Sequence, residues 1–294
     1  MTAGRASPSD SGQTHPGGGE PAPARTRLGV IGWPVAHSLS PRIQNAALTA
    51  AGLSHWRYQL LPVPPELLAE VLPGLPEAGF RGANVTIPHK EAALALATDP
   101  TDRAVAIGAT NTLVFADDGT VTADNTDAPA LIEALAEPLT GRSALVLGAG
   151  GSARAMVWAL LDAGADSVAV WNRSPERAQR LCAELGSVPV TSAGPADVLV
   201  NCTSVGLDGS ASLAGLPIGA DELGEYACVV DLVYSGSGTA LTRAARAAGC
   251  RVVDGVDMLV GQGALSFERF TGRPAPRAVM SAAARQPAEG SDGG

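Results

Sequence analysis

The amino-acid sequence predicts an α/β fold with two α/β domains and a cleft between them. Short apolar runs alternate with helical patterns along most of the chain, and this alternation favours sheets that are covered by helices. A length of 294 residues suits two domains. One series of elements ends before Thr140-Gly141, and a second series starts after it.

The first series predicts an N-terminal domain. Its first strand covers residues 28–32, and Ser40 is expected to cap the following helix, with Pro41 at the first helical position. Asp117-Asp118-Gly119 is typical of a β-hairpin turn. The other expected elements are strands over 58–61 and 83–86, helices that begin near Glu66 and at Pro88, and hairpin strands over 112–115 and 121–123.

The second series predicts a parallel sheet covered on both faces. Its expected strands are 145–147, 168–171, 198–201, 229–232 and 252–253, and its expected helices are 153–163, 176–185 and 241–248. A final helical run over 258–270 is expected to fold back onto the first domain and close the cleft. The predicted parts are a tail over 1–26, domains over 27–126 and 127–257, a returning segment over 258–285 and a tail over 286–294.

Composition argues against several classes of partner. The net charge is −9 and no basic block is present, which argues against nucleic acid and anionic membranes. The two tails are expected to be disordered, and the first 26 residues have no apolar run typical of a signal peptide or anchor. No cysteine belongs to a C-x-x-C pair, so free thiols in a reducing cytoplasm are expected for Cys182, Cys202, Cys228 and Cys250.

The distribution of positive charge points to one residue. Of the 20 basic residues, Lys90 is the only lysine and the rest are arginines. Lys90 can be a surface residue left by chance, or it can do something that arginine cannot. A lysine can release its proton in a suitable environment, whereas an arginine effectively cannot. Position 90 is therefore where proton chemistry should be sought.

A glycine-rich turn predicts a dinucleotide site. The segment Gly148-Ala149-Gly150-Gly151-Ser152-Ala153 has the pattern G-x-G-x-x-A, directly after a predicted strand and at the start of a predicted helix. Glycines let the backbone approach a pyrophosphate, and a helix N-terminus stabilises its negative charge. The alternative is a tight strand–helix turn without a ligand. Because strand, helix and next strand all stand in order, a Rossmann-type site is favoured.

The end of the next predicted strand indicates which dinucleotide binds. An acidic residue there would bind the ribose hydroxyls of NAD, but the sequence has Asn172-Arg173-Ser174, and no carboxylate follows before Glu176. Arg173 offers a positive fork to a 2′-phosphate. The alternative is an exposed residue at a helix start. The sequence therefore favours NADP as the cofactor.

A third motif precedes the first helix. Ser38 and Ser40 stand two residues apart between a strand and a helix N-terminus, where hydroxyls and amides can bind a carboxylate. Taken alone, the simpler interpretation is that Ser40 is a helix cap and Ser38 a loop residue.

These motifs belong to a collinear set. The others are Asn84-Val85-Thr86-Ile87-Pro88-His89-Lys90, Gly108-Ala109-Thr110-Asn111-Thr112, Asp124-Asn125-Thr126-Asp127, Asn201-Cys202-Thr203-Ser204, 231–234 and 255–267. Together they closely resemble the shikimate dehydrogenase family over residues 27–277. The resemblance implies an N-terminal substrate-binding domain, a C-terminal NADP-binding domain, and interconversion of 3-dehydroshikimate and shikimate in aromatic amino-acid biosynthesis.

The resemblance also implies a site. Its catalytic pair is Lys90 and Asp127, which agrees with the chemistry, because reducing a ketone needs a hydride from the cofactor and a proton for the developing alkoxide. The implied substrate residues are Ser38, Ser40, Thr86, Lys90, Asn111, Asp127, Tyr234 and Gln262. The implied cofactor residues are Gly148, Ala149, Gly150, Gly151, Ser152, Asn172, Arg173, Ser174, Arg177, Leu232 and Gly255. No metal is implied, the substrate is a small molecule, and a homodimer is possible.

Some positions depart from the family pattern, and alternatives stay open. Gln44 and His89 stand where histidine and phenylalanine are usual, Ala128-Pro129 replaces a glycine after Asp127, and 235–240 lacks the usual prolines after Tyr234. The alternatives are a relative that also oxidises quinate, with NAD as a candidate cofactor, an enzyme for another small cyclic alcohol, and a non-catalytic module that senses shikimate. Retention of both Lys90 and Asp127 argues against the last.

Overall fold

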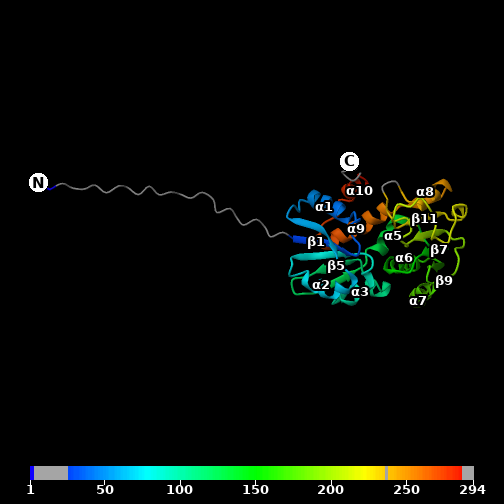
Figure 1. The fold of residues 1–294 in the computed structure, drawn as a ribbon, viewed down its shortest axis with the longest axis horizontal. Helices are drawn as coiled ribbons and strands as arrows, with labels where there is room; N and C mark the ends of the chain where they lie inside the picture. The colour runs from blue at the N-terminus through cyan, green and yellow to red at the C-terminus, as the bar shows by residue number, and fades with distance from the viewer. Residues whose placement is uncertain (3–25, 236–237, 287–294) are drawn as a thin grey trace.

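The computed structural model describes residues 1–2, 26–235 and 238–286. Two lobes are visible in Figure 1, each built on its own sheet. The expectation of disordered tails falls mainly on residues 3–25 and 287–294, which lie outside the described residues, as do residues 236–237 in the loop after Tyr234. Thr26, expected at the end of the tail, belongs to the first strand.

The N-terminal lobe contains a mixed six-stranded sheet in the order β2-β1-β3-β5-β6-β4. Strands β1, β2 and β3 are parallel, whereas β5 pairs antiparallel with both β3 and β6, which confirms the predicted hairpin. The strands are β1 (Thr26–Gly32), β2 (Trp56–Pro62), β3 (Phe80–Val85), β4 (Asp99–Pro100), β5 (Thr112–Phe115) and β6 (Val121–Asp124). The helices of this lobe are α1 (Ser40–Ala50), η1 (Pro65–Leu67), α2 (Leu68–Gly74), α3 (Lys90–Ala95) and α4 (Asp102–Ile107).

The C-terminal lobe contains the predicted parallel sheet, in the order β12-β11-β10-β7-β8-β9. Its strands are β7 (Ser143–Leu147), β8 (Ser167–Trp171), β9 (Val188–Val190), β10 (Val198–Asn201), β11 (Cys228–Asp231) and β12 (Arg251–Val253). Its helices are α6 (Gly151–Asp162), α7 (Pro175–Leu185), η2 (Leu223–Glu225) and α8 (Ala240–Ala247). The topological switch point of this sheet lies between β7 and β10, because the chain runs from β7 toward one edge and from β10 toward the other. Open α/β sheets bind their ligands at such a point, beyond the carboxyl ends of the strands.

Three helices join the lobes: α5 (Asp127–Leu135), α9 (Gly255–Thr271) and α10 (Arg277–Arg285). Helix α9 follows the last strand of the C-terminal sheet and packs against α1, β3 and β5 of the other lobe. Gln44 Nε2 donates to the Gly263 carbonyl at 2.9 Å, and the Phe270 ring lies where a side chain at Gly82 would stand. Helix α9 therefore lies against the N-terminal lobe (Figure 1).

The expected helix starts need two corrections. Ser40 does not cap α1: Leu39 occupies the N-cap, no side chain caps the helix, and the Ser40 amide donates to Ser38 Oγ at 3.2 Å. Helix α3 begins at Lys90 rather than at Pro88, because residues 86–89 form a turn in which the His89 amide donates to the Thr86 carbonyl at 3.0 Å. The short elements β4, α4 and β9, together with α5, were not predicted.

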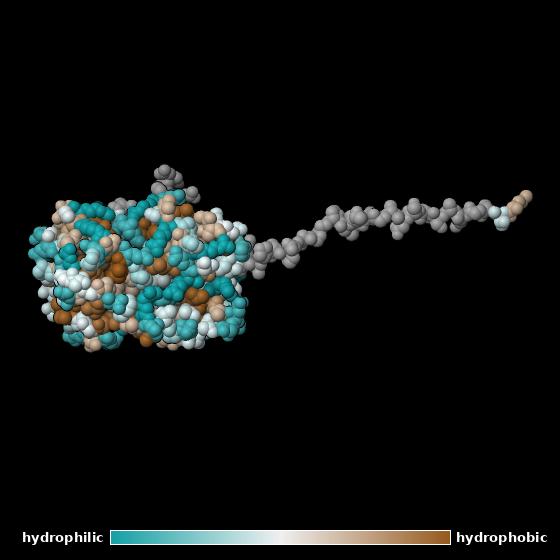
Figure 2. Space-filling model, turned by 180° about the vertical axis from the view of Figure 1, so that it is seen from behind, coloured by the Kyte–Doolittle hydropathy of each residue, from teal (hydrophilic) through white to brown (hydrophobic). Residues whose placement is uncertain are grey.

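The molecular surface has no broad apolar face on the side drawn in Figure 2, where apolar residues form small separate patches. Within the described part of the chain, no helix has the length and apolar character needed to cross a membrane.

Candidate active site

A cavity lies between the lobes, and residues of both line it. Strands β1 and β3 and helix α3 contribute from the N-terminal lobe, and the segments after β10 and β11 contribute from the other. All eight residues expected at the substrate site line this cavity: Ser38, Ser40, Thr86, Lys90, Asn111, Asp127, Tyr234 and Gln262. The structure therefore brings together residues that are far apart in the sequence.

Lys90 and Asp127, which both line this cavity, form an ion pair. Lys90 Nζ donates to Asp127 Oδ2 at 2.6 Å, and the two side chains are only 9% and 11% exposed. Each residue is the first of a helix, Lys90 of α3 and Asp127 of α5. Lys90 Nζ also donates to Ser152 Oγ at 2.9 Å. The only lysine of the chain therefore connects the carboxylate beside the cavity with the glycine-rich turn.

Several contacts hold this pair in place. Asn111 Nδ2 donates to Asp127 Oδ1 at 2.8 Å, and Asn125 Oδ1 accepts from the Asp127 amide at 3.1 Å. The Lys90 carbonyl accepts from the Thr110 amide at 2.9 Å. A Cβ at Gly151 would lie 2.7 Å from the Lys90 Cβ, so only glycine permits this approach of α6 to α3.

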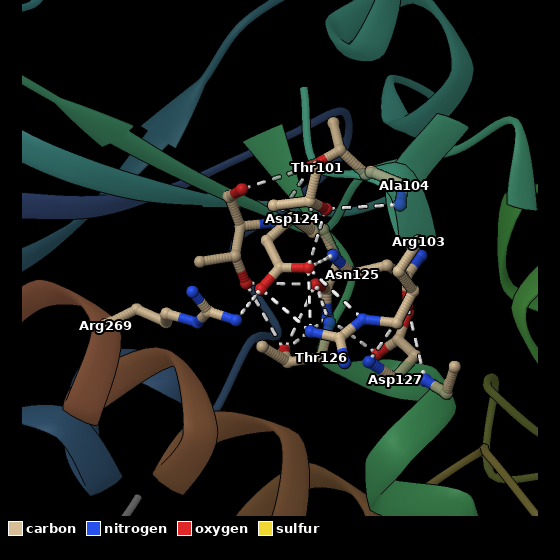
Figure 3. A network of polar contacts seen from close by, with 12 residues as sticks. Thr101, Arg103, Ala104, Asp124, Asn125, Thr126, Asp127 and Arg269 are labelled. Atoms are coloured by element: carbon tan, nitrogen blue, oxygen red, sulfur yellow. Dashed lines mark hydrogen bonds and ion pairs between the residues drawn. The ribbon is translucent and has the colours of Figure 1, made fainter. Parts of the chain in front are cut away.

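An ion-pair network lies directly before Asp127 (Figure 3). Asp124, at the end of β6, binds Arg103 from α4 through both carboxylate oxygens at 2.8 Å and Arg269 from α9 at 2.6 Å. Burial works to raise the pKa of Asp124, but the two arginines and the Asn125 amide outweigh it and hold this pKa below its usual value. The network thus attaches α9 to the sheet beside the Asn125–Asp127 segment.

The segment from Ser38 to Ser40, called the serine loop below, lies beside two tyrosine hydroxyls, of which the sequence indicated Tyr234 as a site residue but not Tyr58. Burial raises the pKa of Tyr234, and hydrogen bonding with Leu39 and Ser38 opposes this more weakly. Tyr58 is buried in β2, and its hydroxyl donates to Asn84 Oδ1 at 2.8 Å. Burial also raises the pKa of Tyr58, with an opposing hydrogen bond from Ser40. Asn84 itself lines the cavity, and its place in a predicted strand end was the available signal.

A second cavity extends along the glycine-rich turn. Eight of the eleven residues expected at the cofactor site line it: Gly148, Ala149, Gly150, Gly151, Ser152, Asn172, Arg173 and Arg177. Ser174 does not line it, and its carbonyl instead accepts from Asn172 Nδ2 at 2.9 Å. Leu232 and Gly255 line the first cavity rather than the second. Trp171, Thr203 and Val205 are lining residues that the sequence reasoning missed.

The residues of this second cavity fit a dinucleotide phosphate. No side chain caps the N-terminus of the 12-residue helix α6, and its first turn has no acidic residue, so its free amides can bind an anion. Gly148 has φ of 112°, and a Cβ there would lie 3.1 Å from the Cys202 carbonyl oxygen. Arg173 and Arg177 are exposed, and within the described residues neither forms an ion pair.

The two cavities meet at the ion pair. Lys90, Ser152 and residues 202–204 line both of them, so ligands in the two cavities would come together there. Burial strongly raises the pKa of the Cys202 thiol, which argues against a nucleophilic thiolate. The arrangement supplies a proton donor, a carboxylate partner and an anion-binding helix end at one junction.

Family models match most of the described chain. The substrate-binding domain of shikimate dehydrogenase matches residues 30–113, a shikimate/quinate 5-dehydrogenase model matches residues 130–204, and the C-terminal domain of shikimate 5′-dehydrogenase matches residues 255–285. The matched segments contain the serine loop, the glycine-rich turn and the start of α9, which are the parts that form the two cavities.

Individual proteins are similar over nearly their whole length. The NADP(+) shikimate dehydrogenase of Paracoccus denitrificans is 46% identical, over 86% of this chain and 93% of its own. Shikimate 5-dehydrogenase from Thermus thermophilus, solved with NADP(H) and shikimate, is 42% identical with a TM-score of 0.78, over 88% of this chain and 98% of its own. The 5-ketofructose reductase of a Gluconobacter species is 29% identical with a TM-score of 0.78, over 90% and 99%.

Proposed function

Since this chain belongs to the shikimate dehydrogenase family, we propose that it catalyses the NADP-dependent, reversible reduction of 3-dehydroshikimate to shikimate. This reaction serves chorismate and aromatic amino-acid biosynthesis. The observation that carries the proposal is the buried Lys90–Asp127 pair, which stands where a substrate cavity meets a dinucleotide cavity.

The pair is proposed to handle the proton. When NADPH is bound, it supplies the hydride for the substrate carbonyl carbon. Lys90 Nζ then donates a proton to the carbonyl oxygen as negative charge develops on it, and Asp127 keeps the ammonium group oriented. Because Lys90 Nζ and Asp127 Oδ2 are 2.6 Å apart, the two residues are proposed to act together as one unit in the proton transfer. In shikimate oxidation the same pair accepts the proton.

The remaining cavity residues are proposed to bind the substrate. Ser38 and Ser40 hold its carboxylate through their hydroxyls and neighbouring amides. Thr86, Asn111 and Gln262 contact its hydroxyl groups, and Tyr234 closes the side beside the serine loop. Asn111 has a second task, because its amide nitrogen already donates to Asp127 at 2.8 Å. One residue therefore connects substrate position with the orientation of the pair.

NADP is proposed to lie along the second cavity. The turn from Gly148 to Ser152 holds the pyrophosphate at the start of α6, and Asn172, Arg173, Ser174 and Arg177 hold the 2′-phosphate. Ser174 can contribute only from the rim, since it does not line the cavity. Leu232 and Gly255 border the nicotinamide from the substrate side.

Following NADPH absorbance with purified protein and 3-dehydroshikimate tests the proposal. Turnover with NADPH that far exceeds turnover with NADH is the expected result. The reverse assay compares shikimate with quinate, and equal efficiency for both acids would favour the broader quinate/shikimate activity. Binding of shikimate without turnover would support a sensing module instead. Reduction of 5-ketofructose alone would place the chain with its Gluconobacter relative.

Location and assembly complete the proposal. The protein is proposed to act in the cytoplasm, which the four free cysteines support, since disulfides are rare in reducing compartments. A homodimer is proposed through β2, the seven-residue strand at one edge of the first sheet: among the described residues no strand pairs with its outer side, and such an edge can pair with a second copy. Light scattering of the purified protein tests this part separately.

A further inference from the structure

Asp231 is a buried acidic residue that the proposed chemistry does not use. It ends β11 with no solvent exposure, and within the described residues no basic side chain forms an ion pair with it. Its carboxylate accepts hydrogen bonds from Asn201 Nδ2 at 2.9 Å, the Val233 amide at 3.1 Å and Thr239 Oγ1 at 2.5 Å. Burying a carboxylate without a positively charged partner costs folding free energy. The groups that bind Asp231 therefore indicate its role.

One set of contacts leads to the segment after β10. Asn201 is oriented by Asp231, and its Oδ1 accepts from the Thr203 amide at 3.0 Å and from Thr203 Oγ1 at 2.7 Å. Thr203 Oγ1 in turn accepts from the Val205 amide at 3.2 Å. Residues 202–204 line both cavities. The carboxylate thus reaches the wall of the cofactor cavity through one amide side chain.

The other contacts lead to the segment after β11. The Val233 amide binds Asp231 directly, while Leu232, Val233 and Tyr234 line the substrate cavity. A Cβ at Gly255 would lie 2.4 Å from the Val233 carbonyl oxygen, so the start of α9 packs closely on this segment. Thr239, which caps α8, fixes the far end of the same loop to Asp231.

We propose that Asp231 is a positioning residue that holds segments 202–205 and 232–234 in the arrangement required by substrate and nicotinamide. This inference rests on the proposed function, because it concerns the same site. Burial raises the pKa of Asp231, so its ionised form opposes folding near neutral pH. Asp231 contacts two segments that face the ligand cavities, and its ionised form lowers the stability of the fold. A role in arranging the site explains why an acidic residue stands at this position.

Asp231→Ala tests the proposal, with Asp197→Ala as its matched control. Asp197 also accepts three hydrogen bonds, from Arg142 Nη1, the Ser143 amide and Ser143 Oγ, but it does so at the opposite end of the same sheet. With shikimate and NADP, Asp231→Ala is expected to lose about 10-fold or more in kcat/KM, on the scale of lost hydrogen bonds to a charged group. The NADPH dissociation constant should change by less than about 3-fold, since the phosphate contacts lie elsewhere.

Conservative replacement separates geometry from charge. Asp231→Asn keeps an acceptor for Val233 and Asn201, and Thr239 Oγ1 can turn to Thr242 Oγ1, 3.2 Å away, so activity should be largely restored. Should Asp231→Ala not fold, Thr239→Val and Thr239→Ser give the same comparison, because only serine keeps the hydroxyl. Equal losses in Asp231→Ala and Asp197→Ala, or an Asn variant as impaired as the Ala variant, would overturn the proposal.

Hydrogen exchange separates failure of this inference from failure of the proposed function. Amides of residues 202–205 and 233–234 should exchange faster in Asp231→Ala than in wild type, whether or not shikimate is the substrate. Asp197→Ala should leave those amides unchanged. Unchanged exchange in Asp231→Ala would refute the positioning role even if the wild type turns over shikimate.

Discussion

At the scale of single residues, Lys90 combines three properties that rarely occur together. It is the only lysine of the chain, its side chain is 9% exposed, and its ammonium group touches groups from both lobes. A buried charge of this kind is retained only when it is paired, and Asp127 provides the pairing. The hydrogen bonds from Lys90 Nζ to Asp127 and Ser152 stabilise the buried ammonium group and also hold it where the two cavities meet.

Lys90→Arg and Lys90→Ala are expected to lose most turnover. Arginine would keep the positive charge, but it does not release and regain a proton under ordinary conditions. General acid–base catalysis contributes about 10²–10⁴-fold, which sets the expected loss in kcat. NADPH binding, measured by calorimetry, should survive in both variants. A folded Lys90→Arg enzyme with near-wild-type kcat would show that position 90 supplies charge alone.

Arg173→Ala is expected to weaken NADPH selectively. Arg173 lines the second cavity and, among the described residues, forms no ion pair that would compete for a phosphate. A charge-assisted hydrogen bond contributes about 1.5–3 kcal/mol, so KM for NADPH should rise by about 10-fold or more. KM for NADH should hardly change, since NADH has no 2′-phosphate. Equal efficiency of the wild type with both cofactors would remove the basis for this role.

Ser38→Ala is expected to raise KM for shikimate and leave cofactor binding intact. Because the Ser40 side chain does not cap α1, replacing Ser40 should not cost helix stability, and substitution of either serine tests substrate binding. Ser38 Oγ does accept from the Ser40 amide, so the matched variant Ser38→Thr should keep most affinity. Titration of shikimate into each variant measures this, and an unchanged dissociation constant in Ser38→Ala would contradict the carboxylate assignment.

At the scale of elements, the start of α6 has two tasks. Its free amides face the second cavity, and Gly151 lets Lys90 from α3 approach within van der Waals contact. A substituent at Gly151 would therefore disturb both the dinucleotide turn and the ion pair. The proposed cofactor site and the proposed catalytic group share one close helix contact.

Gly151→Ala is accordingly expected to reduce kcat as well as NADPH affinity. The new Cβ would lie 2.7 Å from the Lys90 Cβ, which real structures do not allow, so α3 and α6 must move apart. Gly150→Ala is the matched control for kcat, because a Cβ there meets nothing within 4 Å and so leaves Lys90 in place, although it is also expected to weaken NADPH binding at the same turn. Steady-state kinetics of both variants measure the difference. A wild-type kcat in Gly151→Ala would mean that the Lys90–Ser152 contact is unimportant.

At the scale of the whole molecule, each lobe contains a carboxylate whose folded pKa is lowered. Asp124 is held by arginines in the N-terminal lobe, and in the C-terminal lobe the Ser143 amide, Arg142 and Ser143 Oγ lower the pKa of Asp197 to about 2. A depressed folded pKa adds stability that is present above the unfolded value of about 3.9 and lost as pH falls through the folded value. Asp231, whose pKa is raised, works in the opposite direction.

Asp197→Asn is expected to lower Tm near neutral pH, with a difference from wild type that shrinks between pH about 4 and about 2. The Asp197 side chain is partly exposed, so added salt should also reduce this difference. Thermal unfolding followed by circular dichroism at several pH values checks both effects. A pH-independent difference would show that hydrogen-bond geometry, rather than charge, is what Asn lacks.

Local signals in the sequence determined the order of most elements and the chemistry of the motifs. Alternating apolar runs predicted the strands of the parallel sheet, and the glycine pattern predicted the turn before α6, because period and turn chemistry depend on neighbouring residues. The residues expected at the two sites could be named in advance, and all of them except Ser174 line one or both of two adjoining cavities. Short elements such as β4 and β9 were missed because a strand of two or three residues is too short to show alternation of apolar and polar side chains.

Only the tertiary structure decided which distant residues meet. That Lys90 touches Ser152, that Tyr58 supports Asn84, and that Asp231 joins two ligand-facing segments follow from how strands and helices pack. The helix cap expected at Ser40 was wrong because Leu39 already has helical backbone angles and its carbonyl accepts from the Ile43 amide at 3.2 Å, so Ser40 lies inside the first turn. Sequence specifies local conformation through nearest neighbours, whereas a site between two lobes exists only once long-range burial has placed their surfaces together.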